Sequence, residues 1–166
     1  MTVEQMIDEV KRQAVIRSFS MPEHGFMANK ESSIAKRIVE QSALAEYFAC
    51  LVYHAKYSNL NTKGGDGGYD FVLPKTGKTV EVKWLGYVGG TTTPRREGHI
   101  LVRESRGLHA DIYVAVIGDE TTGFEIAGWC TQQELFDSPR FTGKAQKDGT
   151  TNNYAIHTSK LHKTKL

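Results

Sequence analysis

The sequence predicts one α/β (α+β) domain whose helices flank a central mixed β-sheet of about five strands. Two helical patterns of hydrophobic residues occupy most of the chain before residue 55. Short stretches rich in β-branched and aromatic residues follow, beginning with the pair at 69–73 and 79–84. Residues 111–117 are apolar at almost every position, which indicates a strand covered on both faces.

Size and composition favour a folded domain that lies outside the membrane. The chain has 166 residues, of which 39% are hydrophobic and 24% charged, and its net charge of +2 does not by itself indicate a nucleic-acid-binding protein. Cys50 and Cys130 lack metal-ligand spacing, and we expect reduced thiols. No apolar run approaches membrane-spanning length, and the N-terminus lacks the apolar segment of a secretory signal, so we expect a cytoplasmic protein.

The first part of the chain, residues 1–29, is expected to form a helix over 3–18 followed by a loop that contains Pro22 and Gly25. The apolar side of this helix either covers a sheet or binds a partner, which makes it the candidate surface for a homodimer. The longest helical pattern runs over residues 30–55. Its apolar stripe consists of Ile34, Ile38, Leu44, Ala45, Phe48, Ala49, Leu51 and Val52.

The remaining elements are predicted from local patterns. They are a strand at 57–60, a glycine-rich loop at 61–68, a loop at 86–98, strands at 99–103 and 123–130, a helix at 131–136, an edge strand at 153–157 and a tail at 160–166. Thr131 and Glu134 form the pattern of a capping box at the start of the short helix. Residues 30–136 would form the core of the domain, and 137–166 a basic C-terminal extension.

A charged hairpin lies in the middle of this pattern. The strands at 69–73 and 79–84 are joined by a Pro-Lys-Thr-Gly turn. Side chains two apart on a strand share a face, so Glu81 and Lys83 should lie together, with the flanking valines on the opposite face. Asp70 on the first strand should lie near them. This group is either a surface salt-bridge ladder or a functional site.

Two carboxylates and a lysine at this spacing have the chemistry of a phosphodiester hydrolase. Magnesium prefers oxygen ligands and retains several waters, so Asp70, Glu81 and the Val82 carbonyl could hold it, and Mn²⁺ could substitute. Lys83 would orient or deprotonate the attacking water and stabilise the transition state. Arg95 and Arg96, in the loop at 86–98 that we expect to be mobile, either contact DNA phosphates or belong to a solvated turn.

The motif Asp70…Glu81-Val82-Lys83 resembles the PD-(D/E)xK nuclease superfamily, although Tyr69 stands where the proline of the motif would be. The stretches 110–116 and 126–129 are similar to phage and prophage members, in which a strand ending in Gly-Trp precedes a short helix. The resemblance covers about residues 30–136.

This resemblance implies a restriction-endonuclease-like core and metal-dependent cleavage of DNA that leaves a 5′-phosphate, in the host cytoplasm if the protein is phage-encoded. A glutamate on the preceding helix often completes the site in the family. Glu46 fits that place better, and Glu40 is the alternative. Two other functions stay open: a nuclease-fold module that binds nucleic acid or a partner without cutting, and an unrelated α+β domain with structural charges.

Overall fold

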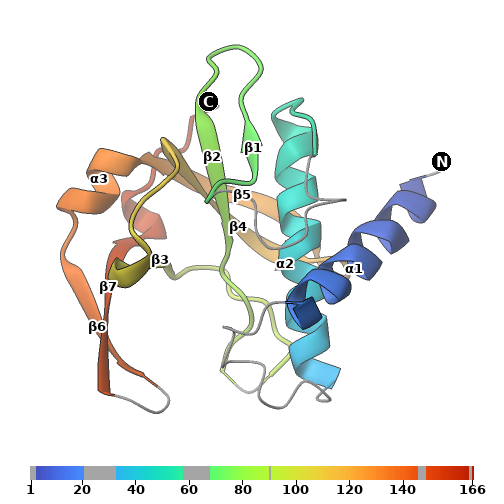
Figure 1. The fold of residues 1–166 in the computed structure, drawn as a ribbon, viewed down its shortest axis with the longest axis horizontal. Coiled ribbons are helices and arrows are strands. Elements are labelled where there is room, and N and C mark those ends of the chain that lie inside the picture. Colours follow the sequence, from blue (N-terminus) through green and yellow to red (C-terminus); the bar gives the residue numbers. More distant parts are fainter. Residues whose placement is uncertain (1–2, 21–32, 58–67, 90, 146–148, 165) are drawn as a thin grey trace.

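The computed structural model of the chain describes residues 3–20, 33–57, 68–89, 91–145, 149–164 and 166 (Figure 1). Its helices are α1 (Val3–Ser20), α2 (Ser33–Val52) and α3 (Gln132–Asp137). Its strands are β1 (Phe71–Val72), β2 (Thr79–Trp84), β3 (His99–Arg103), β4 (Ile112–Asp119), β5 (Gly123–Thr131), β6 (Arg140–Ala145) and β7 (Gly149–His157). The mixed α/β class expected from the sequence is therefore confirmed, and β2 has the expected bounds.

The strands form two sheets, so the expected single sheet of about five strands is wrong. The first sheet has the order β1-β2-β4-β5, in which only β2 and β4 run parallel, and the second has the order β3-β7-β6. β3 belongs to the second sheet, where it pairs along its whole length with β7. Because β7 lies between β3 and β6, the expected edge strand at 153–157 is an inner strand.

β4 is the centre of the fold, and all eight of its residues are buried. On one face, Val114 packs with Val80 and Val82 of β2 in the core that lies under α2. On the other face, Tyr113 and Ala115 pack toward the second sheet. The prediction of a strand covered on both faces is confirmed, although the second cover is a sheet.

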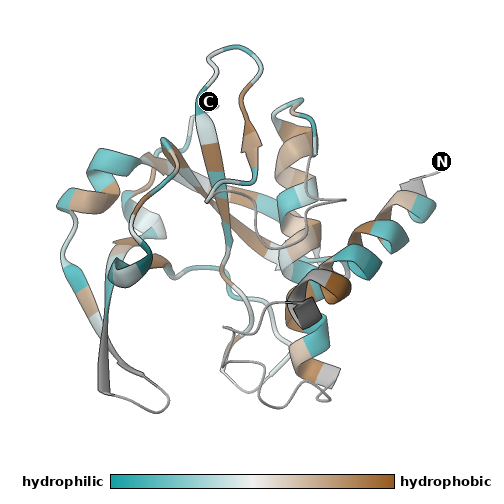
Figure 2. Ribbon diagram, in the orientation of Figure 1, coloured by the Kyte–Doolittle hydropathy of each residue, from teal (hydrophilic) through white to brown (hydrophobic). Residues whose placement is uncertain are grey.

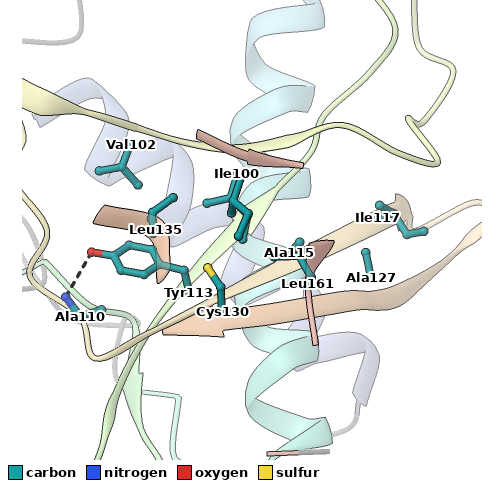
Figure 3. Close-up of a cluster of buried hydrophobic side chains, with 11 residues drawn as sticks. Ile100, Val102, Ala110, Tyr113, Ala115, Ile117, Ala127, Cys130, Leu135 and Leu161 are labelled. Atoms are coloured by element: carbon teal, nitrogen blue, oxygen red, sulfur yellow. Dashed lines mark hydrogen bonds between the residues drawn. The ribbon is translucent and has the colours of Figure 1, made fainter. Parts of the chain in front are cut away.

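The core between the two sheets explains why the C-terminal extension is part of the domain. Ile100 of β3 and Ile156 of β7 meet Tyr113, Leu135 and Leu161 in one buried cluster (Figure 3). The Tyr113 hydroxyl accepts hydrogen bonds from the backbone N–H groups of His109 and Ala110. Residues beyond 137, polar and basic in composition, thus supply a layer of the core rather than a separate tail.

α1 packs mainly on α2. Its buried residues Val10 and Ala14 contact Ala43 and Leu44 of α2. Phe124 of β5 packs against the same cluster. Figure 2 shows hydrophobic colour concentrated on the central strands, while α3 is mainly hydrophilic. Neither described long helix is apolar enough over a sufficient length to cross a membrane.

Several expected segments fall outside the described residues. These are most of the loop at 18–29, the strand at 57–60 apart from Tyr57, and the glycine-rich loop at 61–67. The predicted helix at 30–55 is observed as Ser33–Val52, and the chain turns at His54, which has a positive φ of 53°. The capping box is confirmed, because Thr131 accepts the N–H of Glu134 and Glu134 accepts the N–H of Thr131.

A buried carboxylate at the end of β4, that of Asp119, interacts with Arg37 of α2. Asp119 at the end of β4 is 1% exposed, and its Oδ1 accepts the N–H groups of Thr121 and Thr122 at 3.0 and 2.8 Å. Its Oδ2 accepts the hydroxyl of Tyr87 at 3.3 Å and lies 3.5 Å from the Arg37 guanidinium of α2. Burial alone would raise the pKa of Asp119, but the hydrogen bonds from Thr122, Thr121 and Tyr87 outweigh it and the pKa is lowered.

We expect Asp119→Asn to lower the free energy of unfolding by about 1.5–3 kcal/mol at neutral pH, because hydrogen bonds to a charged acceptor are lost. A carboxyl with a lowered folded-state pKa stabilises above its unfolded-state pKa, and this stability is lost as the pH falls through the folded-state value. The gap between wild type and variant should therefore shrink in acid. Urea denaturation at neutral and acidic pH, with exposed Asp137→Asn as control, measures it. An equal gap at both pH values contradicts the role of the charge.

Candidate active site

The alternation along β2 places the charged residues as the sequence predicts. Val80 and Val82 are buried in the core under α2. Glu81 and Lys83 lie on the opposite face, with side chains 18% and 30% exposed, and form an ion pair. Glu81 and Lys83 are in register with Tyr113 and Ala115 of the parallel neighbour β4. The pair is thus anchored over the centre of the first sheet rather than on a freely solvated surface.

Asp70 lies where the hairpin opens. Its backbone N–H donates to the Val80 carbonyl at 2.8 Å, one residue away from the Phe71–Val80 register. Its side chain is 3% exposed, and Oδ2 accepts the N–H of Val82 at 2.6 Å. The carboxylate therefore replaces a backbone strand partner just before β1 begins, which holds it next to the middle of β2.

The Val82 carbonyl points toward the same edge. In a strand, the N–H and C=O of one residue face the same neighbouring strand. Because the Val82 N–H is directed at Asp70, its carbonyl oxygen also faces the Asp70 side of β2 and not β4. The arrangement thus brings a backbone oxygen, a buried carboxylate and the Glu81–Lys83 pair to one part of the sheet.

Lys83 is held in its charged form. Partial burial alone would lower its pKa, but the Glu81 carboxylate, and then Asp70 and Glu46, favour the ammonium, and the net pKa is raised. An ammonium at this position, beside these acids, can orient water and stabilise negative charge.

The structure separates the two candidate helix acids. Glu46 of α2 is close enough to stabilise the Lys83 ammonium and, with Asp70, to raise the pKa of Cys50. Glu40 lies nearly two turns earlier and approaches Lys36 on its own helix at 3.8 Å. Glu46 therefore shares the electrostatic environment of Asp70 and Lys83, as the preferred assignment requires.

The carboxylates of Asp70 and Glu81 are oxygen ligands of the type that magnesium prefers, but they do not form a compact cluster. Within the described residues, no three Asp, Glu, His or Cys side chains lie close enough to hold a metal ion. The available set is the carboxylates of Asp70 and Glu81 with the backbone oxygen of Val82. Magnesium is usually held through one or two carboxylates and several waters, so this set fits a largely hydrated ion.

Arg95 and Arg96 lie in a hydrogen-bonded turn within the loop at 86–98. The Arg95 guanidinium donates to the Tyr87 carbonyl at 2.8 Å, and the Arg95 N–H donates to the Gly86 carbonyl. A β-bridge between Tyr87 and Pro94 closes the turn. Both arginines are exposed, and the bond made by Arg95 leaves Arg96 better suited to contact a phosphate.

A short loop beside the site was not identified from the sequence. His109 packs over Gly68, where an added Cβ would lie 2.6 Å from the His109 Cβ, and Gly68 has a positive φ of 91°. The His109 ring is fixed by a 2.6 Å hydrogen bond between Nε2 and the Arg106 carbonyl. Glycine at 68 thus lets the 104–110 loop pack next to the segment that carries Asp70. The glycine run alone did not indicate this close approach.

The two cysteines are buried and free. Burial, followed by the nearby acids, raises the pKa of Cys50 to about 12, and burial with Glu134 does the same for Cys130. Thiols with such pKa values are poor nucleophiles at neutral pH. Neither cysteine is therefore a candidate catalytic residue.

No family model, curated protein or solved structure matches this chain.

Proposed function

We propose that this protein is a divalent-metal-dependent deoxyribonuclease built on a restriction-endonuclease-like core. The observation that carries the proposal is the convergence of Asp70, Glu81 and Lys83, with Glu46 near enough to act on the lysine. A surface ladder would not require a 3% exposed aspartate whose carboxylate takes the place of a backbone partner. The fold supports the proposal through α2, the β1–β2 hairpin and the parallel strand β4.

Asp70, Glu81 and the Val82 carbonyl would hold the metal ion. A magnesium ion bound there supplies neutralisation of the phosphate charge and a water of lowered pKa. The Lys83 ammonium would stabilise the charge that develops on the phosphate oxygens and orient the attacking water. Arg96, which is exposed, would contact a phosphate outside the reacting centre.

The decisive experiment incubates the purified chain with duplex, single-stranded, nicked and four-way-junction DNA in the presence of magnesium or manganese. We expect cleavage with a 5′-phosphate product, and its loss in EDTA and in Asp70→Asn. If no metal and no substrate in this panel gives cleavage above that of Asp70→Asn, the protein is not a nuclease. The same panel distinguishes endonucleolytic from exonucleolytic products.

One feature of the site also fits a second function, the binding of nucleic acid without cleavage. The Glu81 carboxylate is already paired with Lys83, and no compact three-acid group occurs among the described residues. A nuclease-fold module that binds nucleic acid without cutting would have these features. Calorimetric titration with manganese separates the two functions: a catalytic site binds the ion with dependence on Asp70 and Glu81, whereas a binding module retains DNA affinity without such an ion.

The helix acid gives a matched pair of variants. We expect Glu46→Gln to slow cleavage by about 10-fold or more and to lower the pKa of Lys83, because one of the charges that favour the ammonium is removed. Glu40→Gln, on the same helix, should cleave as wild type. Single-turnover rates with a labelled duplex measure both. Equal rates for the two variants would exclude Glu46 as a site residue.

A further inference from the structure

The outer face of the second sheet carries side chains that the proposed hydrolytic site does not use. On β3, Ile100 and Val102 point into the core between the sheets. His99, Leu101 and Arg103 alternate with them and are exposed on the opposite face. This face is formed by the second sheet, whereas the proposed hydrolytic site lies on the first.

Three rings lie together on this face. His99 is paired in register with His157, and their ring centroids are 4.8 Å apart. The Phe141 ring of β6 is 5.9 Å from His99 with an interplanar angle of 32°. Phe141 is 47% exposed and Leu101 is 44% exposed, although both are large hydrophobic residues. Adjacent exposed apolar groups of this kind mark a binding surface more often than isolated ones do.

A hollow of about 510 Å³ opens beside the rings. Its lining includes the three rings together with Ala155, Pro139 and Lys160. A small buried residue, Ala155, lies in β7 between the larger side chains. The hollow is large enough to admit a planar group against the rings, and Lys160 supplies a positive charge at its border.

Two acids, Glu134 and Asp137, also line the hollow, and both are already engaged. Glu134 accepts hydrogen bonds from the N–H of Thr131 and contacts the His162 ring at 2.7 Å. Asp137 accepts the side-chain amide of Gln133 at 2.9 Å. Across residues 137–166 the sequence has six Lys and Arg residues against two acids, so the segment that builds most of this sheet favours an anionic partner.

We propose that the outer face of the β3-β7-β6 sheet binds an unpaired segment of nucleic acid. Bases stack on Phe141 and His99, and Lys160 and Arg103 contact the phosphates. Aromatic platforms bordered by cations bind single strands in this way, because every base has a face that can stack. The proposal goes beyond the hydrolytic function and does not depend on it, since binding is measured without metal.

The test is fluorescence anisotropy in EDTA with labelled oligothymidylate of about 16 nucleotides, a length that spans one such platform. Oligouridylate and a duplex of equal length form the other arms. We expect both single strands to bind more tightly than the duplex, because stacking needs unpaired bases. Phe141→Ala and His99→Ala should each weaken binding by about 5- to 150-fold. Phe136→Ala, an equally exposed phenylalanine on α3, should bind as wild type.

A second variant reports directly on stacking at position 141. Phe141→Trp should retain affinity, and its tryptophan fluorescence should be quenched at saturation beyond any change in the wild-type signal. Inorganic polyphosphate at equal charge should compete poorly, since it has no bases. Equal losses in Phe141→Ala and Phe136→Ala, effective competition by polyphosphate, or unquenched fluorescence each overturn the proposal. If the wild-type protein binds single strands but does not cleave DNA with magnesium, only the proposed nuclease function is contradicted.

Discussion

Replacing Lys83 by methionine is expected to slow DNA cleavage by about 10²–10³-fold while the protein stays folded, because a charge aimed at the transition state is removed. The ammonium is favoured by Glu81, Asp70 and Glu46 against the effect of partial burial, so it carries a full charge at neutral pH. Methionine matches the lysine side chain as far as Cε and lacks only the charged Nζ. Single-turnover cleavage of a labelled duplex, with circular dichroism for the fold, measures the effect.

Two further lysine variants show what the charge does. Lys83→Arg keeps a positive charge but cannot accept a proton at accessible pH. We expect it to cleave faster than Lys83→Met, because the charge and not proton removal is used. Lys75→Met, in the exposed turn before β2, is the matched control and should cleave as wild type. If the arginine and methionine variants are equally slow, a role in removing the water proton is the better explanation.

Local chemistry made β2 and the short helix predictable. The alternation of Val80 and Val82 with Glu81 and Lys83 gives both the strand and its buried face, since one side of the strand must meet the core. The capping box of α3 is equally local, because its two partners are three residues apart. These elements depend only on residues that are close in the sequence.

The second sheet was not predictable in the same way. β3 and β7 pair His99 with His157, and hydrophobic periodicity indicates a strand without naming its partner. β6 and the first half of β7 are also polar in sequence, so their strand pattern is weak. The choice of helix acid was difficult to predict for a similar reason, because it depends on contacts between distant parts of the chain. Glu40 and Glu46 project in different directions from α2, and which one faces Lys83 depends on how the helix docks on the sheet.

The largest expected loss of stability comes from the residue next to Asp70. Phe71 is 1% exposed, lies in the core under α2, and stacks on Tyr53 with ring centroids 6.1 Å apart. Phe71→Ala should lower the free energy of unfolding by about 3–5 kcal/mol, through lost burial and the cavity left behind. For a chain of this length, that corresponds to a decrease in Tm of about 6–20 °C.

Val72 gives the control, because it follows Phe71 on the same short strand and is 42% exposed. Val72→Ala should change stability by less than about 0.5 kcal/mol. Urea denaturation measures both variants, with an unchanged m-value showing that the unfolding transition is the same. A large loss for Phe71→Ala alone would support the packing of β1 against α2, which keeps Asp70 and Glu46 close enough to act on Lys83. Similar losses for both variants would mean that β1 does not pack this way, and the grouping of the acids around Lys83 would lose its structural basis.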